Sequence, residues 1–512
     1  MNSDYAIIAF TDNWGSHHGG VNAFNYDFVR ALDEYYNGVA DIYCVVNNCT
    51  RKAKQEEKGV TLISLGLDCS EVTLSDESLE YIATKIGSNK HTYCVGHDII
   101  SGEAAIVAAE ALGGKSVLIH HMSYDGYKSV EKNSESAVIK KNKQIEIFSK
   151  GDHLFAIGPK LVTSLKDLTN NQREVNEIIP GLVDCNPVEI PTSQKSLFIS
   201  GRLDAGIIKQ GMLAIAGFCS YIKNQSPRNP AGYKIYAIGA KNNDDDDERE
   251  IQNKAEEYAG RVVNIQTLPY TTDRDALFKE LASKSLAAMP SWHEGFGLSA
   301  WEAISAEVPL IITLSSGVYE LLEKCSLERE VQVIDVLATL YPPYFVEKDL
   351  KNFTDAVSLI LNNEEKEKRR AKKLKKILLE EYRFSWTTCA YKFMEDIIDG
   401  CEDIEWKRNH EKVETMALGK LAGKKLAPRI KDWVTDKLSE LDYGIHTEEW
   451  VLPEQGGEPM VPGMENEIDS FLARGVMNVV NDAIEITEIN RDCSFSDFMK
   501  ISEAWDEMVN AL

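Results

Sequence analysis

The amino-acid sequence predicts an α/β protein made of two doubly wound domains, with a mostly helical appendage after them. The chain has 512 residues, which is more than one hydrophobic core usually supports. Short apolar runs of strand length alternate with longer helical patterns, as in parallel sheets that helices cover on both faces. The alternation restarts after a cluster of three prolines, Pro180, Pro187 and Pro191.

The first domain is predicted over residues 1–185. A buried strand at 5–10 is followed by a glycine-containing loop and a helix over 21–36 with apolar residues at helical spacing. The other predicted strands are residues 41–46, 60–64, 92–95 and 116–119, and a helix covers 103–112. Strands that are apolar throughout indicate a parallel, Rossmann-like sheet buried on both faces.

The second domain is predicted over residues 186–400. Its expected strands are 196–200, 234–238, 262–265, 286–289 and 310–313, with helices at 212–223 and from an acidic loop at 242–250 to about 258. Open sheets of this kind bind ligands at the carboxyl ends of their strands. The loops that follow the strands are therefore where we expect the chemistry.

A charged helix is predicted over residues 364–381, and it has two interpretations. Its eight lysines and arginines would suit a nucleic-acid partner. The alternative, which we favour, is a solvated helix face whose buried stripe is Leu374, Ile377 and Leu378.

The appendage is predicted over residues 401–512, an acidic segment with 24 acidic and 12 basic residues. Helical patterns at 413–441 and 466–484 flank a loop at 451–464 that contains three prolines and three glycines. The segment could be an oligomerisation module, a partner-binding module or a lid, and the sequence does not rank these.

The overall charge excludes several kinds of partner. Asp and Glu total 81 against 56 Lys and Arg, a net charge of -25 that repels phosphate backbones and anionic lipids, so no nucleic-acid partner is expected. Apolar runs long enough to span a membrane are missing from the sequence, and the start of the chain has no signal-peptide pattern. We therefore expect a cytoplasmic protein with reduced thiols, since the ten cysteines form no CxxC pair or metal-finger spacing.

The sharpest motif lies after the predicted strand 286–289, where Glu294 and Glu302 stand eight positions apart around a glycine-containing turn that opens a helix. The helix start would point the amides of Phe296, Gly297 and Leu298 at a ligand, together with the positive end of the helix dipole. A phosphate suits that place. Carboxylates on either side suit hydroxyls that flank the phosphate, because a carboxylate accepts hydrogen bonds from a diol.

These residues resemble the E-x7-E element of glycosyltransferase family 4, whose members are retaining nucleotide-sugar transferases of the GT-B fold. The resemblance extends to Val308-Pro309, to the segment from Ser200-Gly-Arg202 to Lys209-Gln-Gly211, and to Gly19-Gly20 after the first strand. Together the matches cover about 400 residues in the family's order.

The resemblance implies a role for each matched residue. Arg202 and Lys209 would bind the donor diphosphate and stabilise the charge of the leaving group. Glu302 would hold the ribose hydroxyls and Glu294 those of the transferred sugar, while the two glycines let the backbone approach the phosphates. No metal and no separate cofactor are expected, because two cations and a helix dipole can neutralise the diphosphate.

The sequence departs from the family pattern in three places. Arg202 and Lys209 are seven positions apart, which is a two-residue insertion relative to the family spacing. Glu307 stands where the family often has glycine, and residues 315–320 replace a more glycine-rich loop. Lys209 is the assignment that the insertion affects most.

The first domain is expected to supply the acceptor side. The family commonly places a histidine near the transferred sugar, and we prefer His121 over His120 for it; the alternative is a buried, hydrogen-bonded histidine. The other expected acceptor-side residues, at or just after strand ends, are Tyr124, Asp125, His97 and Asp98. His17 and His18 are expected to be solvated loop residues.

The expected activity is a hexosyltransferase-like transfer from a nucleotide diphosphate sugar to an acceptor hydroxyl, with retention at the anomeric carbon. The alternatives are an inactive GT-B scaffold that binds a nucleotide sugar or a partner protein, and another GT-B enzyme such as an epimerase or a phosphorylase. The segment around Trp386 resembles the family's closing helix, which packs back on the N-terminal domain.

Overall fold

A computed structural model describes most of the first 398 residues. The described ranges are 4–16, 19–36, 39–57, 59–87, 90–124, 134–183, 195–200, 206–225, 232–238, 245–268 and 274–398. Residues 1–397 form one compact unit. Arg202, Asp125, His17, His18 and the predicted appendage 401–512 lie outside the described residues.

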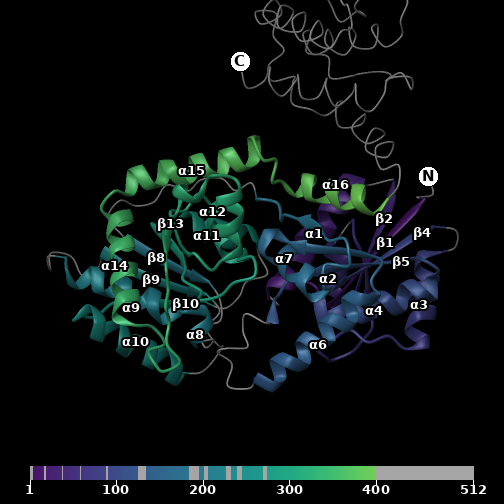
Figure 1. Cartoon of the computed structure of the whole chain (residues 1–512), viewed down its shortest axis with the longest axis horizontal. Coiled ribbons are helices and arrows are strands. Elements are labelled where there is room, and N and C mark those ends of the chain that lie inside the picture. Colours follow the sequence, from purple (N-terminus) through teal and green to yellow (C-terminus); the bar gives the residue numbers. More distant parts are fainter. Residues whose placement is uncertain are drawn as a thin grey trace, which may run out of the picture. The chain divides into compact units, whose positions relative to one another are not determined.

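The N-terminal lobe is a seven-stranded parallel sheet with strand order β3-β2-β1-β4-β5-β6-β7. Its strands are β1 (Tyr5–Asn13), β2 (Ala40–Asn48), β3 (Thr61–Ser64), β4 (His91–His97), β5 (Lys115–His120), β6 (His153–Ile157) and β7 (Asn176–Ile178). Its helices are α1 (Gly20–Tyr36), α2 (Arg51–Glu56), α3 (Asp76–Ile86), α4 (Asp98–Leu112), α6 (Ser134–Lys150) and α7 (Gly158–Leu168). Figure 1 shows these helices around the sheet.

The C-terminal lobe repeats this plan with a six-stranded parallel sheet in the order β10-β9-β8-β11-β12-β13. Its strands are β8 (Lys195–Ser200), β9 (Tyr233–Ile238), β10 (Asn264–Leu268), β11 (Leu286–Met289), β12 (Leu310–Thr313) and β13 (Gln332–Ile334). Its helices are α8 (Gly206–Lys209), α9 (Gly211–Lys223), α10 (Asp245–Ala259), α11 (Arg274–Ala282), α12 (Leu298–Ser305), α13 (Gly317–Lys324), α14 (Glu347–Leu361) and α15 (Glu364–Glu380). The two doubly wound sheets confirm the predicted fold class.

Several element boundaries differ from the prediction. The strand expected at 262–265 is β10, which starts at Asn264, and Val262 is 71% exposed. The prediction also lacked β6, β7 and β13. Of these, β7 and β13 have only three residues each, too few to show an apolar period.

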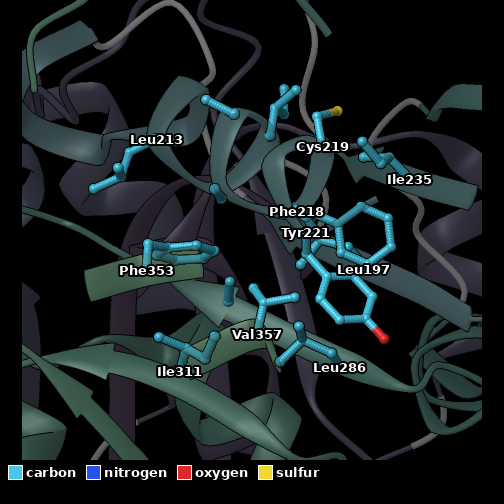
Figure 2. Close-up of a cluster of buried hydrophobic side chains, with 14 of the residues drawn as sticks. Leu197, Leu213, Phe218, Cys219, Tyr221, Ile235, Leu286, Ile311, Phe353 and Val357 are labelled. Atoms are coloured by element: carbon cyan, nitrogen blue, oxygen red, sulfur yellow. The ribbon is translucent and has the colours of Figure 1, made fainter. Parts of the chain in front are cut away.

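The core of the C-terminal lobe lies between its sheet and the helices α9 and α14 (Figure 2). Phe353 on α14 is fully buried and lies against Gly217 on α9. A Cβ at Gly217 would lie 2.4 Å from the Phe353 ring, so glycine is what allows these two helices to pack so closely.

The charged helix α15 has the predicted arrangement of a buried stripe and a charged outer face. Leu374 and Leu378 are buried, while Ile377 is only half-buried. Arg370 pairs with Glu330 and Glu367, so part of the positive charge is matched within the lobe.

The last described helix, α16 (Trp386–Ile397), packs on the N-terminal lobe as expected of a closing helix (Figure 1). The ring of Phe393 lies 4.9 Å from that of Phe28 on α1 and 5.1 Å from that of Phe155 on β6, measured between centroids. Across the described ranges, we find no helix with the length and apolar character needed to cross a membrane.

We predict that Phe353→Ala destabilises the C-terminal lobe by about 3–5 kcal/mol, because it leaves a cavity in a fully buried site. Leu359→Ala is the matched control on the same helix, since Leu359 is 44% exposed. Urea unfolding followed by tryptophan fluorescence measures both. Equal effects of the two substitutions would contradict the assignment of Phe353 to the core.

Candidate active site

The centre of the site is Glu294, in the loop between β11 and α12. Its backbone N–H donates to the carbonyl of Ser315 (3.3 Å), and the Ser291 hydroxyl donates to Oε2 of Glu294 (3.2 Å). Nζ of Lys209 lies 2.5 Å from the same carboxylate oxygen. The fold therefore brings the predicted diphosphate-binding lysine and the predicted sugar-binding carboxylate into one ion pair.

Helix α12 begins directly after this loop, and the residue before its first turn is Gly297, whose φ is +109°. A Cβ there would lie 2.8 Å from the Met289 side chain, so both the conformation and the space favour glycine. Within the described part of the chain, the N–H groups of Phe296, Gly297 and Leu298 have no hydrogen-bond acceptor. Unpaired amides at a helix start form a site for an anion.

The glycine loop of the N-terminal lobe faces this helix start. Gly19 has a φ of +107°, and Gly20 begins α1. A Cβ on Gly20 would lie 3.4 Å from Cδ1 of Leu298, so the start of α1 lies directly against the start of α12. The glycine loop and the start of α12, which are both predicted to bind phosphate, therefore lie next to each other.

The second carboxylate of the motif, Glu302, is held by an arginine that the sequence analysis did not single out. Arg274, at the start of α11, donates to Glu302 (2.5 Å) and, in the other lobe, to Asp27 on α1 (2.8 Å). Glu302 and Arg274 line a small pocket together with Phe24, Trp301 and other residues. Burial raises the pKa of Asp27 to about 6, although Arg274 acts in the opposite direction.

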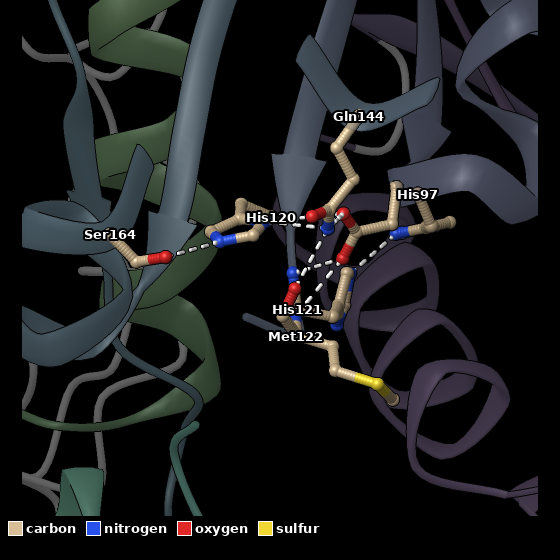
Figure 3. A network of polar contacts seen from close by, with 7 residues as sticks. His97, His120, His121, Met122, Gln144 and Ser164 are labelled. Atoms are coloured by element: carbon tan, nitrogen blue, oxygen red, sulfur yellow. Dashed lines mark hydrogen bonds and ion pairs between the residues drawn. The ribbon is translucent and has the colours of Figure 1, made fainter. Parts of the chain in front are cut away.

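On the predicted acceptor side, a buried polar network organises the turn after β5 (Figure 3). The Asp98 carboxylate accepts hydrogen bonds from the backbone N–H of His121 (2.6 Å) and of Met122 (3.0 Å). It also contacts His120 Nδ1 (3.1 Å) and Gln144 Nε2 (2.5 Å). His120 is fully buried, whereas His121 keeps some exposure.

The structure corrects the predicted place of His97 and Asp98. Both were expected to line the acceptor cleft, but their side chains are buried, at 0% and 3% exposure. They lie beneath the turn that carries His121 and support it. Tyr124 is partly exposed, and its ring lies 5.4 Å from Nζ of Lys140.

Burial keeps His97 and His121 neutral. It lowers the pKa of His121 to about 4, with Asp98 opposing and His120 adding to the shift. Burial and the neighbouring His121 also hold the pKa of His97 well below its usual value. For Asp98, burial would raise the pKa, but the interaction with His120 and the hydrogen bond from the backbone N–H of His121 outweigh burial and lower the pKa.

The predicted donor side and the predicted acceptor side touch each other directly. A Cβ on Gly295 would lie 3.2 Å from the carbonyl oxygen of His121, and a Cβ on Gly158 would lie 2.7 Å from the Phe296 ring. Lys160 of α7 reaches across to donate to the carbonyl of Ser315. The loop that carries Glu294 therefore packs against the turn that carries His121.

A comparison with protein-family models gives one match over residues 8–393, to the family described as family 4 glycosyltransferases in conflict systems. The chain belongs to that family. No curated protein matches the chain.

Solved structures similar to this family member have the same two-lobed fold. Sucrose-phosphate synthase from Thermosynechococcus elongatus aligns with a TM-score of 0.57 at 14% identity, over 76% of this chain and 97% of its own. HepE of Anabaena, solved with UDP and glucose, aligns with a TM-score of 0.55 at 12% identity, over 77% and 99%. These likenesses support the GT-B fold, whose two lobes are the two sheets described above.

We predict that His121 makes the folded glycosyltransferase less stable in mild acid. Its folded pKa is below its unfolded pKa of about 6.5, so the unfolded chain binds the extra proton and stability falls as the pH falls from 6.5 towards 4. Between pH 7 and pH 5 this contribution is about 2 kcal/mol. Urea unfolding at both pH values measures it.

The His121→Gln variant should lose that part of the pH dependence. His91→Gln, at an exposed position, is the matched control and should keep it. An unchanged pH dependence in His121→Gln would show that His121 is not held neutral by burial.

Proposed function

We propose that the protein transfers a hexosyl group from a nucleotide diphosphate sugar to an acceptor hydroxyl, with retention of the anomeric configuration. The observation that carries the proposal is the assembly of Lys209, Glu294 and the open start of α12 opposite the glycine loop. A cation, a helix N-terminus and a carboxylate at one place suit a ligand with a diphosphate next to sugar hydroxyls.

In this proposal the ion pair between Lys209 and Glu294 prepares both groups for the donor. A bound diphosphate offers Lys209 a second anion, so that the lysine lies between the phosphate and the carboxylate. Glu294 keeps one oxygen for the sugar hydroxyls, and Ser291 and the backbone hold it in place. Arg202 would add a second cation, as the family pattern implies.

Glu302 would bind the ribose hydroxyls through the oxygen that Arg274 leaves available. Arg274 Nη1 donates a hydrogen bond to Oε1 of Glu302, so the other carboxylate oxygen can accept a hydrogen bond from a hydroxyl. The pocket around Glu302 also has aromatic walls, which suit the apolar faces of a nucleoside.

The reaction exchanges one bond at the anomeric carbon for another. The bond from that carbon to the diphosphate oxygen breaks, and the acceptor oxygen forms a new bond on the same face. The acceptor's proton passes to the departing phosphate oxygen, and the cations and the start of α12 stabilise the charge there. The contact between the lobes excludes water, which limits hydrolysis of the donor.

The similar structures give indirect support for the choice of donor. HepE is described as a complex with UDP and glucose, and the other structure is named a sucrose-phosphate synthase. We therefore place UDP-hexoses first in the set of donors to be tested.

The test is release of nucleoside diphosphate from a panel of nucleotide sugars, with and without cell extract as acceptor. We expect release with at least one donor, and Glu294→Ala and Arg202→Ala to lower turnover at least about 10-fold. Each removes a charged contact of roughly 1.5–3 kcal/mol. Glu323→Ala, on the exposed face of α13, is the control.

If the protein neither binds a donor nor releases nucleoside diphosphate, the proposed transferase activity is wrong and the scaffold alternative remains. Near-wild-type turnover in both variants would instead show that the site lies elsewhere. The anomeric configuration of the product, read by NMR, decides between retention and inversion.

We also predict that turnover does not depend on a divalent metal. Lysine, arginine and helix amides can balance the diphosphate charge in its place. Initial rates with excess EDTA and with added Mg²⁺ or Mn²⁺ should agree within about two-fold; loss of activity in EDTA that Mg²⁺ restores would contradict this.

A further inference from the structure

Three side chains from three separate elements form a line of hydrogen bonds that ends at the acceptor side. Asn25 on α1 lies next to His97 at the end of β4, with 2.9 Å between Oδ1 and Nε2. His97 in turn lies next to His121 after β5, with 2.9 Å between Nδ1 of the first ring and Nε2 of the second (Figure 3). Asn25 and His97 are buried, at 1% and 0% exposure.

The chemistry of these atoms sets the direction of the line. The Asn25 amide oxygen can only accept, so His97 carries its proton on Nε2 and its Nδ1 has a free lone pair. That lone pair accepts from His121, which must then carry its own proton on Nε2. The remaining nitrogen of His121, Nδ1, is left as an acceptor.

The surroundings keep both rings in this neutral state. Among the described residues, Asp98 and His120 are the titratable groups that act on the two rings, and the Cys44 thiol lies beside Asn25. Asp98 is occupied by the backbone of the His121 turn and by His120. Burial raises the pKa of Cys44 to about 12, so the thiol stays protonated beside Asn25. Phe24 also packs edge-on against both imidazole rings and fixes their planes.

We propose that Asn25 and His97 are positioning residues that hold His121 in the tautomer with Nε2 protonated and Nδ1 free to accept. Nδ1 of His121 has no hydrogen-bond partner in the described ranges, and the residue is partly exposed. A group that binds at Nδ1 of His121 must donate a hydrogen bond. The proposal rests on the proposed function only for the identity of that group. A sugar hydroxyl meets that requirement, and a carboxylate, as in a uronic acid, does not.

The opposite direction of the hydrogen bonds would require a flipped Asn25 amide, with its nitrogen and oxygen exchanged. Its nitrogen would then donate to His97, and its oxygen would accept from the Cys44 thiol. In the structure the Asn25 nitrogen instead faces Cys44, 3.4 Å from the sulfur. His121 would in that case carry its proton on Nδ1 and would donate to the substrate.

The experiment is NMR of the full-length, ¹⁵N-histidine-labelled protein at pH 7 without substrate. Long-range ¹H–¹⁵N correlation spectra distinguish a protonated ring nitrogen from an unprotonated one, and His121→Gln and His97→Gln assign the signals. We expect both rings to be neutral and protonated on Nε2. A wild-type His121 protonated on Nδ1 would overturn the proposal, whatever the enzymatic activity.

Two substitutions at Asn25 separate positioning from simple packing. Asn25→Asp keeps an acceptor oxygen and should keep the wild-type tautomer, whereas Asn25→Leu, of similar size, should give mixed tautomers of His121. If a donor is turned over, Asn25→Leu should lower kcat about 3- to 10-fold, as expected for a lost hydrogen bond, and Asn25→Asp should restore most of it.

Equal tautomer populations in both Asn25 variants would overturn the role of Asn25. If the protein shows the expected tautomers but releases no nucleoside diphosphate from any donor, the proposed function is wrong. The proposed positioning of His121 by Asn25 and His97 is then still supported.

Discussion

The predicted acceptor side of the site depends on one buried carboxylate, Asp98. It lies at the start of α4 with a φ of +46°, a conformation that non-glycine residues rarely adopt. Its two oxygens satisfy the backbone N–H groups of His121 and Met122 as well as the side chains of His120 and Gln144. Without it, several buried donors would have no partner, so the turn after β5 would lose its shape. The position of the His121 ring therefore depends on this buried carboxylate.

The contact between the lobes adds a second constraint, which is space. Gly158 and Gly295 lie where the loop that carries Glu294 meets the N-terminal lobe, and neither position has room for a Cβ without movement of its neighbours. Arg274 adds a charged contact across the same interface by pairing with carboxylates of both lobes. The arginine thus links Glu302, the predicted ribose-binding group, to α1 of the other lobe.

The sequence predicted those features that follow from local pattern. Apolar strand runs identified both sheets, and the spacing of Glu294 and Glu302 located the loop and helix at the carboxyl end of β11. Comparison with the family pattern also singled out Glu307, at a position where the family often has glycine. Its φ of +58° explains that preference. Asn25, Asp27 and Arg274 belong to no motif. They acquire their partners only when α1, α11 and the ends of β4 and β5 come together, which a single sequence does not reveal.

The two-residue insertion before Lys209 shows how the fold can absorb such a departure. The residues before Lys209 form the short helix α8, which shortens the path that an extended insertion would take. The Ile208 carbonyl accepts from the N–H of Trp292, which ties α8 to the loop of Glu294. Gln210 then takes a left-handed φ of +53° and donates to the carbonyl of Tyr344. These three features bring Lys209 to Glu294 despite the longer loop. The number of residues between Arg202 and Lys209 therefore does not by itself decide where the Lys209 side chain lies.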